Sequence, residues 1–347
     1  MSPSLRTQSL NDSANTIHAE SVIVDGLVFM SDGYTADLRA GNVAAINLTV
    51  TPFESDFATA CDHVAVWLHR VSAPHSDWHI VKRAADIETA RSAGKTGLIM
   101  GWQNMRPVED QLHRISFFHA LGVRIMQLTY NNRNFIGDGC LETDSGLSLF
   151  GRKLVREMNR VGIAIDLSHV GERTSLQALE ISERPVLLTH ANAYAVAPTP
   201  RNKSDDLIKA VAAKGGTIGV SIYGPMCWDR NPAHPPCLDD FLRHVDHIVD
   251  LVGVQSIAFG TDLPAVRDLK TVEEMLEFTR TRFPENVGLY EQSFGGGARE
   301  RYVREIGNQR DLPLMTAALL DRGWSPADIK GLLGANLIRA LQKAWID

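Results

Sequence analysis

The sequence has few cysteines and lacks any long apolar run, and each absence excludes a class of protein. The four cysteines (Cys61, Cys140, Cys227 and Cys237) include no Cys-x-x-Cys pair, which excludes the common zinc-finger spacings and indicates a reducing compartment. No apolar stretch has the length of a signal-peptide core or of a membrane span. We therefore predict a cytoplasmic protein with no membrane partner.

A surplus of basic residues is also missing. The 347 residues include 35 lysines and arginines against 41 aspartates and glutamates, which gives a formal net charge of −6 without any basic run. Hydrophobic residues make up 44% of the chain and charged residues 22%, a balance typical of globular rather than disordered proteins. We expect a small-molecule partner and no nucleic acid, and the composition leaves open a homo-oligomer.

Internal repeats and linker-like segments are absent as well. The length would allow two domains, but it also suits one barrel domain over residues 1–347, with residues 1–20 as an N-terminal extension. The segment from Phe283 to Ile306 is rich in glycine but lacks the spacing of a phosphate-binding loop. We interpret it as a loop over or beside the functional site.

What the chain does contain is a regular alternation of short apolar strands with helical patterns. The eight predicted strands are Val22–Asp25, Ala44–Val50, Gly97–Gly101, Val123–Thr129, Val161–Leu167, Val186–Thr189, Thr217–Ile222 and Ile257–Thr261. The predicted helices are Phe57–Arg70, Ile87–Ser92, Asp110–Ala120, Leu149–Arg160, Glu172–Ile181, Asp205–Ala213, Leu238–Leu251 and Val272–Arg280. A doubly wound open sheet would show the same alternation, but the count of eight favours an α/β fold of the (β/α)8 TIM-barrel type.

Two further helices are predicted at the C-terminal end, over residues 311–347. The first is Asp311–Asp321. The second begins after Ser325, which suits the N-cap, with Pro326 at its first position, and it continues to Trp345. Its apolar residues recur at helical spacing, so we expect it to pack on the barrel wall.

The stretch from Val161 to Asn202 is the most informative part of the sequence. It is predicted to form a strand, a helix and a strand, and histidines follow the two strands at His169 and His190. In a parallel unit of this kind both imidazoles lie at the carboxyl edge of the sheet, where they can share one divalent metal. The alternative is that the two histidines only bind loop backbone.

Other polar residues follow the remaining strands. Gln103 comes after the third strand, Tyr130 and Asn131 after the fourth, and Asp262 after the eighth. An aspartate across the barrel from metal-binding histidines is placed to accept a proton from water. The alternative for Asp262 is a helix cap or a salt bridge in a loop.

Several further residues are weaker candidates for chemistry. Cys140 follows the fourth strand closely enough to act as a soft ligand or a nucleophile, but no base stands beside it in the sequence. The histidines at 63, 69, 244 and 247 lie within helical patterns without carboxylates around them. We interpret these four as solvated or core histidines.

Four segments carry a resemblance to a known family. They are LGVRIMQLTYNNRN, GLSLFGRKLVREMNRVGIAIDLSHV, RPVLLTHANAYAV with the following PRNKSDD, and AFGTDLPAV. Together they resemble the renal (membrane) dipeptidase family, peptidase family M19 of the amidohydrolase superfamily. The resemblance implies a TIM barrel in which His169 and His190 bind metal, Arg201 holds a substrate carboxylate, and Asp262 is a metal ligand that also handles the proton.

Three positions depart from the pattern of that family. Its His-x-Asp metal ligands follow Asp-Gly, but here Asp25-Gly26 is followed by Leu27-Val28-Phe29. The family's bridging glutamate is replaced by Gln103, whose neutral amide cannot hold two cations together. The substrate-facing histidine is replaced by Tyr130. We therefore expect one divalent metal per chain, with zinc as the first candidate, held by His169 and His190 with help from Gln103 or Asp25.

The expected activity is that of a metal-dependent hydrolase that cleaves a dipeptide or a related small amide bearing a carboxylate. Tyr130 would donate a hydrogen bond to the developing oxyanion, and Asp262 would transfer the proton. Arg201, Asn131 and Gln103 would bind the substrate. Two rivals remain, a barrel retuned for a non-peptide substrate and a barrel that binds a small carboxylate without turnover.

Overall fold

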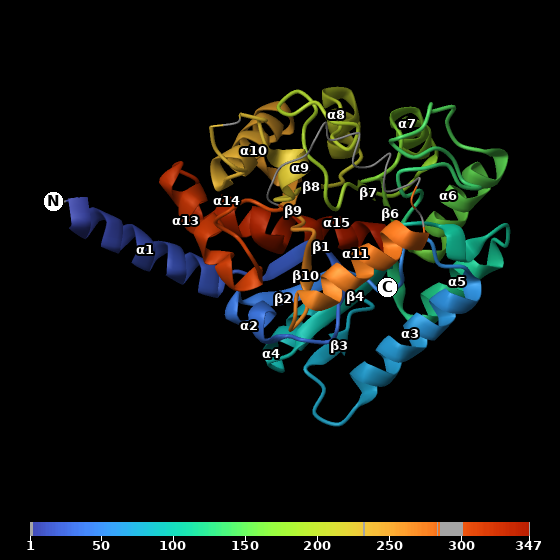
Figure 1. The fold of residues 1–347 in the computed structure, drawn as a ribbon, viewed down its shortest axis with the longest axis horizontal. Helices are drawn as coiled ribbons and strands as arrows, with labels where there is room; N and C mark the ends of the chain where they lie inside the picture. The colour runs from blue at the N-terminus through green and yellow to red at the C-terminus, as the bar shows by residue number, and fades with distance from the viewer. Residues whose placement is uncertain (1–2, 232, 283, 285–300, 347) are drawn as a thin grey trace.

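The computed structural model describes residues 3–231, 233–282, 284 and 301–346. Strands lie in the middle of the molecule, and most of the helices lie around them (Figure 1). The strands are β1 (Ile23–Ser31), β2 (Val43–Thr49), β3 (Trp78–Ile80), β4 (Thr96–Trp102), β5 (Val123–Gln127), β6 (Ala164–Asp166), β7 (Val186–Leu187), β8 (Ile218–Val220), β9 (Ile257–Phe259) and β10 (Leu263–Ala265).

Helices connect successive strands, as the alternating pattern predicts. The longer ones are α1 (Pro3–Glu20), α2 (Ala36–Ala40), α3 (Phe57–Ser72), α4 (Ala85–Ser92), α5 (His113–Leu121), α6 (Leu149–Val161), α7 (Glu172–Ile181), α8 (Asp205–Ala213), α10 (Leu238–Val252), α11 (Lys270–Arg282), α13 (Pro313–Asp321), α14 (Pro326–Lys330) and α15 (Asn336–Ala344). Short helical segments are η1 (Arg106–Val108), α9 (Gly224–Cys227), η2 (Val254–Ser256), η3 (Gln309–Asp311) and the π-helical η4 (Gly331–Ala335).

The parallel sheet confirms the predicted (β/α)8 barrel, although its ladder is not continuous. One sheet runs in the order β10-β1-β2-β4-β5-β6-β7, with β3 beside β4, and β8 pairs with β9. A single bridge between Leu188 and Ile218 joins β7 to β8. The eighth barrel strand is split, because β9 runs into β10 and only β10 pairs with β1. The strands therefore follow one another in barrel order without closing into one uninterrupted ladder.

Two strand boundaries differ from the prediction. The first strand is longer than Val22–Asp25 and places Leu27 and Phe29 inside β1. The fifth was predicted to begin at Val161, but Val161 is the last residue of α6. Gly162 ends that helix in a left-handed conformation (φ 88°), which is accessible to glycine at little cost. The strand β6 consequently begins only at Ala164.

The C-terminal helix is broken rather than continuous. Ser325 caps α14 as predicted, since its side chain accepts a hydrogen bond from the Asp328 amide. The chain then passes through η4, where Gly334 lies so close to β1 that a Cβ atom would stand 2.1 Å from the Val22 carbonyl oxygen. Only a residue without a side chain fits at this contact. The helix resumes as α15.

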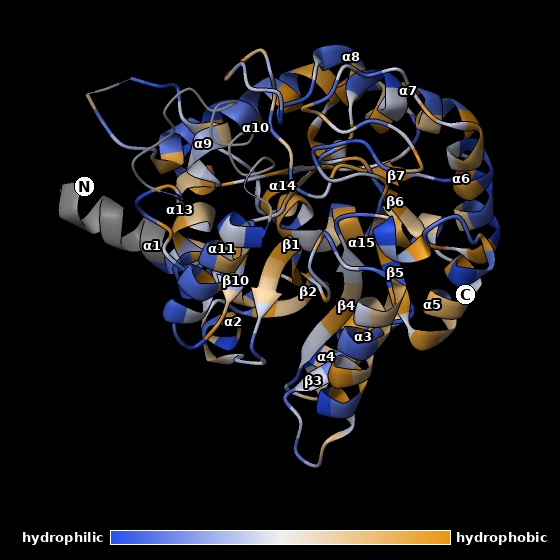
Figure 2. Cartoon of the chain, turned by 45° about the vertical axis from the view of Figure 1, so that its right-hand side comes forward, coloured by the Kyte–Doolittle hydropathy of each residue, from blue (hydrophilic) through white to orange (hydrophobic). Residues whose placement is uncertain are grey.

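The two faces of each strand pack against different partners. Along β4, Leu98, Met100 and Trp102 belong to the main core with the outer helices. Ile99, between them, belongs to an inner cluster that also contains Leu341 and Trp345 of the C-terminal segment. Leu332 and Leu333 of the same segment belong to the main core, so the C-terminal segment packs on the strands through both clusters. Figure 2 shows the apolar strands inside and the hydrophilic faces of the helices outside.

The N-terminal extension is helical. The helix α1 ends on α13, where the buried imidazole of His18 lies 2.8 Å from the Thr316 hydroxyl and 3.0 Å from the Gly41 carbonyl oxygen. Over the residues that the structure describes, no helix is both long enough and apolar enough for a bilayer crossing.

Candidate active site

Two buried histidines meet at the carboxyl ends of neighbouring strands. His169 follows β6 and His190 follows β7, and their Nε2 atoms are 2.9 Å apart. Both side chains are buried. Neither ring binds loop backbone among the described residues, so the alternative of two purely structural loop histidines loses its support.

The hydrogen bonds of the other ring nitrogens fix how these imidazoles are protonated. Nδ1 of His169 is 2.7 Å from the Asn131 side-chain oxygen, which can only accept. Nδ1 of His190 is 2.8 Å from the Thr189 hydroxyl, whose own proton goes to Asp166 at 2.7 Å. Both rings therefore carry their proton on Nδ1, and the lone pairs of both Nε2 atoms face each other.

No proton separates the two lone pairs at neutral pH. Burial, followed by the nearby Arg201 guanidinium, holds the pKa of both His169 and His190 well below the ordinary value. Two neutral imidazoles that converge in this way are a donor set for a divalent metal, since zinc binds imidazole nitrogen at about 2.0–2.1 Å. The residues thus fit the metal that the sequence predicts.

A buried carboxylate and a buried arginine hold the two histidine loops. Asp166 accepts hydrogen bonds from the amides of Ser168 (3.0 Å) and Thr189 (3.1 Å) and from both hydroxyls. Arg201 donates to the backbone carbonyl oxygens of Ser168 and His190. Its Nε has no partner among the described residues. Arg201 therefore positions the histidines, and its predicted contact with substrate stays a prediction.

Asp25 is not available to the metal. Its carboxylate accepts from the amides of Leu27 (3.1 Å) and Thr261 (2.8 Å) and from the Thr261 hydroxyl (2.6 Å). Burial raises its pKa to about 7 in spite of these hydrogen bonds. The carboxylate joins β1 to the end of β9, so we discard the hypothesis that Asp25 helps to bind metal at the mouth.

Asp262 has the opposite environment. Its backbone is fixed in a left-handed conformation (φ 58°), with its amide donating to the Leu27 carbonyl oxygen at 3.0 Å. Its carboxylate accepts no hydrogen bond and forms no close ion pair among the described residues, so it neither caps a helix nor closes a loop. Burial raises its pKa to about 6, against the opposing effects of Arg301 and Arg201.

Tyr130 forms one wall of the site. Its ring stacks between Phe53, at 4.1 Å between centroids, and His169, at 4.2 Å. Burial raises the pKa of its phenol, so the hydroxyl stays protonated. Within the described part of the chain this hydroxyl has no hydrogen-bond partner, which leaves it available as a donor.

Asn131 and Gln103 occupy less direct positions than the sequence predicts. The Asn131 side-chain oxygen is used by His169 and by the thiol of Cys140, at 3.5 Å. Asn131 therefore orients His169, and its predicted role in substrate binding stays a prediction. The Gln103 amide donates to the Thr49 hydroxyl at 3.0 Å. Cys140 lies beside this group, and a role for its thiol remains a prediction.

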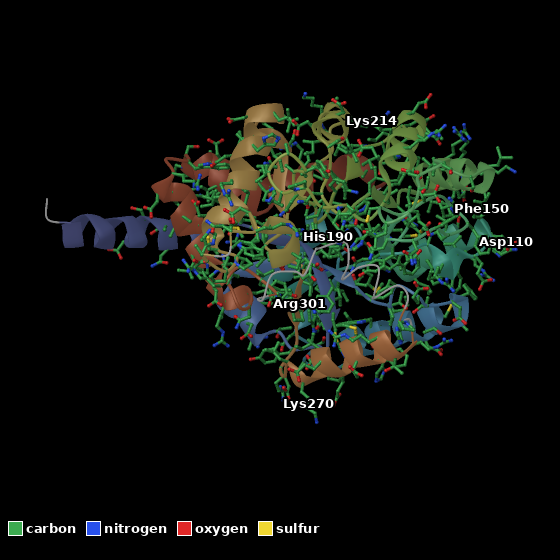
Figure 3. The ribbon with its side chains drawn as sticks, turned by 45° about the horizontal axis from the view of Figure 1, so that its top comes forward. Asp110, Phe150, His190, Lys214, Lys270 and Arg301 are labelled. Atoms are coloured by element: carbon green, nitrogen blue, oxygen red, sulfur yellow. The ribbon has the colours of Figure 1, made fainter. Side chains whose placement is uncertain are left out.

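One arginine of the site follows no motif in the sequence. Arg301 extends its guanidinium over the rings of Phe29 (5.1 Å) and Tyr223 (5.7 Å), and its Nε donates to the Tyr302 hydroxyl at 3.2 Å. That hydroxyl donates to the Asp262 carbonyl oxygen at 2.7 Å. Figure 3 shows Arg301 and His190 near the middle of the molecule, far from the labelled surface residues Lys214 and Lys270.

Arg301 lies just beyond the part of the predicted loop 283–306 that falls outside the described residues. It follows no strand, so strand-end reasoning could not find it. A second missed residue is Lys203, whose buried ammonium donates to the Val170 carbonyl oxygen at 2.7 Å and whose pKa burial lowers to about 8.

The remaining histidines stand apart from this site. His244 is buried, accepts from the Ala193 amide at 3.2 Å and lies 3.1 Å from the Cys227 carbonyl oxygen. His247 pairs with Asp205 at 2.8 Å on the outer helices. His244 is a core histidine, whereas His247 has a carboxylate beside it that the sequence pattern does not reveal. The interpretation of the four helical histidines as solvated or core residues stays a prediction.

Comparison with known proteins identifies the family. The family model described as membrane dipeptidase (peptidase family M19) matches residues 37–281. The chain belongs to this family. Dipeptidase tcpJ of Claviceps purpurea is 26% identical to this M19 chain over 302 residues, 84% of this chain and 63% of that protein. The match to dipeptidase verJ of Clonostachys rogersoniana, at 26% identity over 79% of this chain, covers 62% of that protein, so the chain spans less than two thirds of these relatives.

Solved structures extend the comparison over the whole chain. An amidohydrolase from Pseudomonas aeruginosa is 31% identical, with a TM-score of 0.82 over 96% of this chain and 99% of that one. A metallo peptidase from Rhodobacter sphaeroides, liganded with a phosphinate mimic of the dipeptide L-Ala-D-Ala, is 19% identical, with a TM-score of 0.76 over 94% of this chain and 100% of that one. The second likeness concerns the fold alone. The family resemblance predicted from the motifs is confirmed.

Within this M19 chain the first of the three departures brings apolar side chains to β1. Leu27 is buried in β1, and Phe29 supports the guanidinium of Arg301. Where the resemblance places two ligands of a first metal, the chain has two apolar side chains and a cation. Near the mouth, His169 and His190 are the pair of described residues that could bind a metal. The one cluster of three metal-binding side chains among the described residues lies elsewhere.

Proposed function

We propose that this M19 protein is a metal-dependent hydrolase of a small amide bearing a carboxylate, with one divalent metal at the barrel mouth. The observation that carries the proposal is the pair of Nε2 lone pairs of His169 and His190, which face each other at 2.9 Å in a buried site. Zinc is the first candidate. When bound, such a metal lowers the pKa of water and polarises a carbonyl group.

Asp262 and Tyr130 supply the remaining chemistry. The Asp262 carboxylate, with a pKa of about 6, is mostly ionised at neutral pH and still basic enough to accept a proton from water. The same group can then return that proton to the leaving nitrogen. The neutral Tyr130 hydroxyl can donate a hydrogen bond to the oxyanion as it develops.

The charges around the mouth support a substrate that carries a carboxylate. Arg301 and Arg201 both act electrostatically on Asp262 and Tyr130. The Asp262 carboxylate accepts no hydrogen bond from the described residues. A substrate carboxylate is therefore favoured, whereas a free ammonium group would meet two guanidinium groups. We expect N-acyl amino acids to be better substrates than dipeptides with a free amino terminus.

To test the proposal, metal-free protein is reloaded separately with Zn²⁺, Co²⁺ or Mn²⁺. Each form is then assayed on panels of dipeptides and N-acyl amino acids by measuring the amino acid released. Hydrolysis that requires the metal and that His190→Ala abolishes is the expected result. His247→Ala, which removes a histidine outside the site, is the matched control. Metal-independent turnover, or full activity of His190→Ala, would refute the proposal.

The alternative of a barrel retuned for a non-peptide substrate is favoured by Leu27, Phe29 and Arg301, which fill one side of the mouth with apolar surface and a cation. It predicts metal-dependent cleavage of another C–N bond and no activity on either panel. A barrel that only binds carboxylates would take up N-acyl amino acids in calorimetry without turnover. Cytoplasmic location, a single domain and homo-oligomer formation stay predictions from the sequence.

A further inference from the structure

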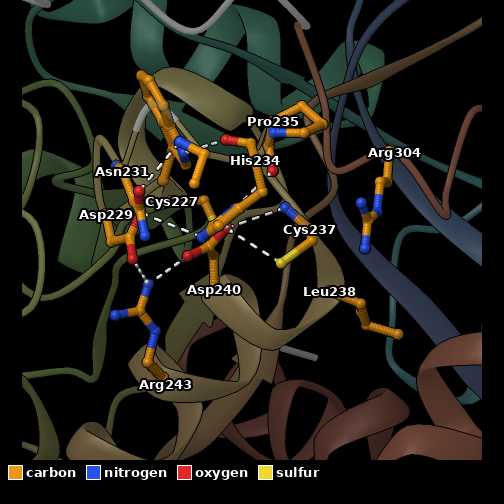
Figure 4. Close-up of polar contacts among 12 residues, drawn as sticks. Cys227, Asp229, Asn231, His234, Pro235, Cys237, Leu238, Asp240, Arg243 and Arg304 are labelled. Atoms are coloured by element: carbon orange, nitrogen blue, oxygen red, sulfur yellow. Dashed lines mark hydrogen bonds and ion pairs between the residues drawn. The ribbon is translucent and has the colours of Figure 1, made fainter.

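A second group of metal-binding side chains lies away from the histidine pair, where the loop after α9 meets the first turn of α10. It consists of His234, Cys237 and Asp240, whose ligand atoms all lie within 4.8 Å of one another. Asp229 and Arg243 surround it (Figure 4). None of these residues takes part in the proposed hydrolysis.

The local sequence explains why these side chains converge. Cys237 is the N-cap of α10 and Asp240 its third residue, and each side chain accepts from the other's backbone amide in a capping box. This places the Cys237 thiol 3.3 Å from the Asp240 carboxylate. Pro235 and Pro236 turn the chain just before the helix, which brings His234 Nδ1 to 4.0 Å from the same carboxylate oxygen.

These separations suit one metal ion. Tetrahedral zinc with nitrogen, sulfur and oxygen ligands at about 2.0–2.3 Å holds neighbouring ligand atoms roughly 3.3–3.8 Å apart. The thiol of Cys237 and the carboxylate of Asp240 already have this separation. His234 Nδ1, at 4.0 Å from that carboxylate, has to move closer to both, and the ligand atoms of the three residues all lie within 4.8 Å of one another. His234 and Cys237 are partly exposed, which gives the ion a path from solvent and room for a water ligand.

The surrounding charges favour a divalent cation. Asp229 lies 3.7 Å from His234 Nε2, so once Nδ1 binds metal, Nε2–H faces a carboxylate that orients the ring. Arg243 pairs with Asp240 and with Asp229, at 3.3 Å from the latter. With the Cys237 thiolate, these two carboxylates carry three negative charges, which Arg243 and one divalent ion balance.

We propose that His234, Cys237 and Asp240 form a second metal site for a borderline-soft divalent ion such as Zn²⁺ or Co²⁺, separate from the histidine pair at the barrel mouth. Binding displaces one proton, from the Cys237 thiol to solvent, and gives up the contact of His234 Nδ1 with the Pro235 carbonyl oxygen, now 2.9 Å away. The mixture of thiolate, imidazole and carboxylate selects these ions over Mg²⁺ and Ca²⁺.

The site has a structural consequence for the barrel mouth. The Pro236 carbonyl oxygen accepts from the Arg304 amide at 2.9 Å, and the Leu238 amide donates to Glu305 at 2.8 Å. These two bonds attach the metal-binding turn to the segment that carries Arg301. A bound ion therefore fixes the segment that places Arg301 beside Asp262.

Cobalt titration of the metal-free full chain tests the site, because thiolate bound to tetrahedral Co²⁺ gives a near-ultraviolet charge-transfer band. We expect the band to grow to one equivalent in a His169→Ala/His190→Ala background, in which the mouth pair is gone, and to bleach on adding Zn²⁺. The same band must form in the wild-type chain, where the mouth takes up a further equivalent. Its absence from both would overturn the proposal.

Matched variants separate metal binding from folding. Cys237→Ser removes the thiolate but keeps a strong N-cap, so α10 is retained while the affinity for Co²⁺ falls more than about 100-fold. Asp229→Asn, which weakens only the partner of the histidine, should lower the affinity about 10–100-fold. Cys61→Ser and Cys140→Ser should keep the band. A band that survives in Cys237→Ser, or disappears in Cys140→Ser, would place the ion elsewhere.

Discussion

At the scale of single residues, Asp25 and Asp262 are two buried aspartates in different hydrogen-bonding environments. Both follow or lie on neighbouring strands of the barrel, and burial raises the pKa of each. Asp25 is saturated by three hydrogen bonds and joins two strands, whereas the Asp262 carboxylate has none from the described residues. Hydrogen-bond saturation, and not the pKa, separates the structural carboxylate of Asp25 from the carboxylate that we propose as the base.

Asp262 predicts the pH dependence of activity. Because the ionised carboxylate is the base, kcat/KM should increase as the pH rises through about 6 and then level off. Asp262→Asn should lower kcat by about 10²–10⁴-fold and remove this limb from the profile. Asp268→Asn, which removes an exposed carboxylate beyond β10, should change neither. An unchanged acid limb in Asp262→Asn would assign the proton transfer to another group.

Asp25 predicts how stability varies with pH. Its folded-state pKa of about 7 lies above the ordinary value of 3.8, so between these pH values the folded protein holds a proton that the unfolded chain has lost. The free energy of unfolding therefore falls as the pH rises through this window, by up to about 4 kcal/mol at about 1.4 kcal/mol per pKa unit. Urea unfolding at several pH values should show a flatter dependence in Asp25→Asn than in the wild type. Asp12→Asn, at an exposed site, should follow the wild type.

Asn131 is a positioning residue whose effect should appear in metal affinity. Its left-handed backbone (φ 57°) suits asparagine and glycine, so Asn131→Gly deletes the hydrogen bond to His169 without straining the turn. We expect the affinity of the mouth for Zn²⁺ to fall about 10–100-fold, measured by competition with a chromophoric chelator. Asn131→Asp keeps the acceptor and should restore binding. Equal losses in both variants would contradict the orienting role.

At the scale of elements, Gly334 links the C-terminal helices to the barrel. Gly334→Ala places a Cβ against the Val22 backbone, which cannot yield as a side chain would, so the free energy of unfolding should fall by about 1–3 kcal/mol. Gly307→Ala is the control, because its nearest neighbour would be 3.7 Å away. Chemical denaturation of the two variants measures the difference. Equal stabilities would show that η4 repacks freely.

The sequence predicts the elements better than their ends. Strands such as β4 are buried on both faces, so their apolar runs are visible without any structure. Their boundaries depend on single backbone conformations, such as the left-handed Gly162 that delays β6, and on contacts distant in sequence, such as Gly334 against Val22. Neither leaves a periodic signal.

At the scale of the whole molecule, parallel strands explain which site residues the sequence reveals. His169, His190, Tyr130 and Asp262 follow strands, and the barrel gathers strand ends at one edge. Arg301 reaches the same edge from a segment far along the chain, and the use of Asn131 for His169 depends on the shape of one turn. The positions of these side chains depend on tertiary packing, which a local sequence pattern does not predict.

The last prediction concerns the metal count at the mouth. Leu27→His, Phe29→Asp and Gln103→Glu together restore the ligands that the family resemblance places there. The structure adds an obstacle, because the Arg301 guanidinium lies over the Phe29 ring next to Asp262 and would repel a second cation. We therefore expect the triple variant to bind one zinc at the mouth, and the quadruple variant with Arg301→Ala to bind two.

Elemental analysis after dialysis gives the counts, with Cys237→Ser in every protein so that the second proposed site does not contribute. Circular dichroism verifies the fold, since buried carboxylates without metal cost several kcal/mol. The matched control is Arg310→Ala with the triple variant, which removes an arginine paired with Asp37 on the surface. Two zinc ions at the mouth of the triple variant would show that Arg301 does not exclude the first metal. One ion in the folded quadruple variant would show that the three restored ligands alone cannot rebuild that site.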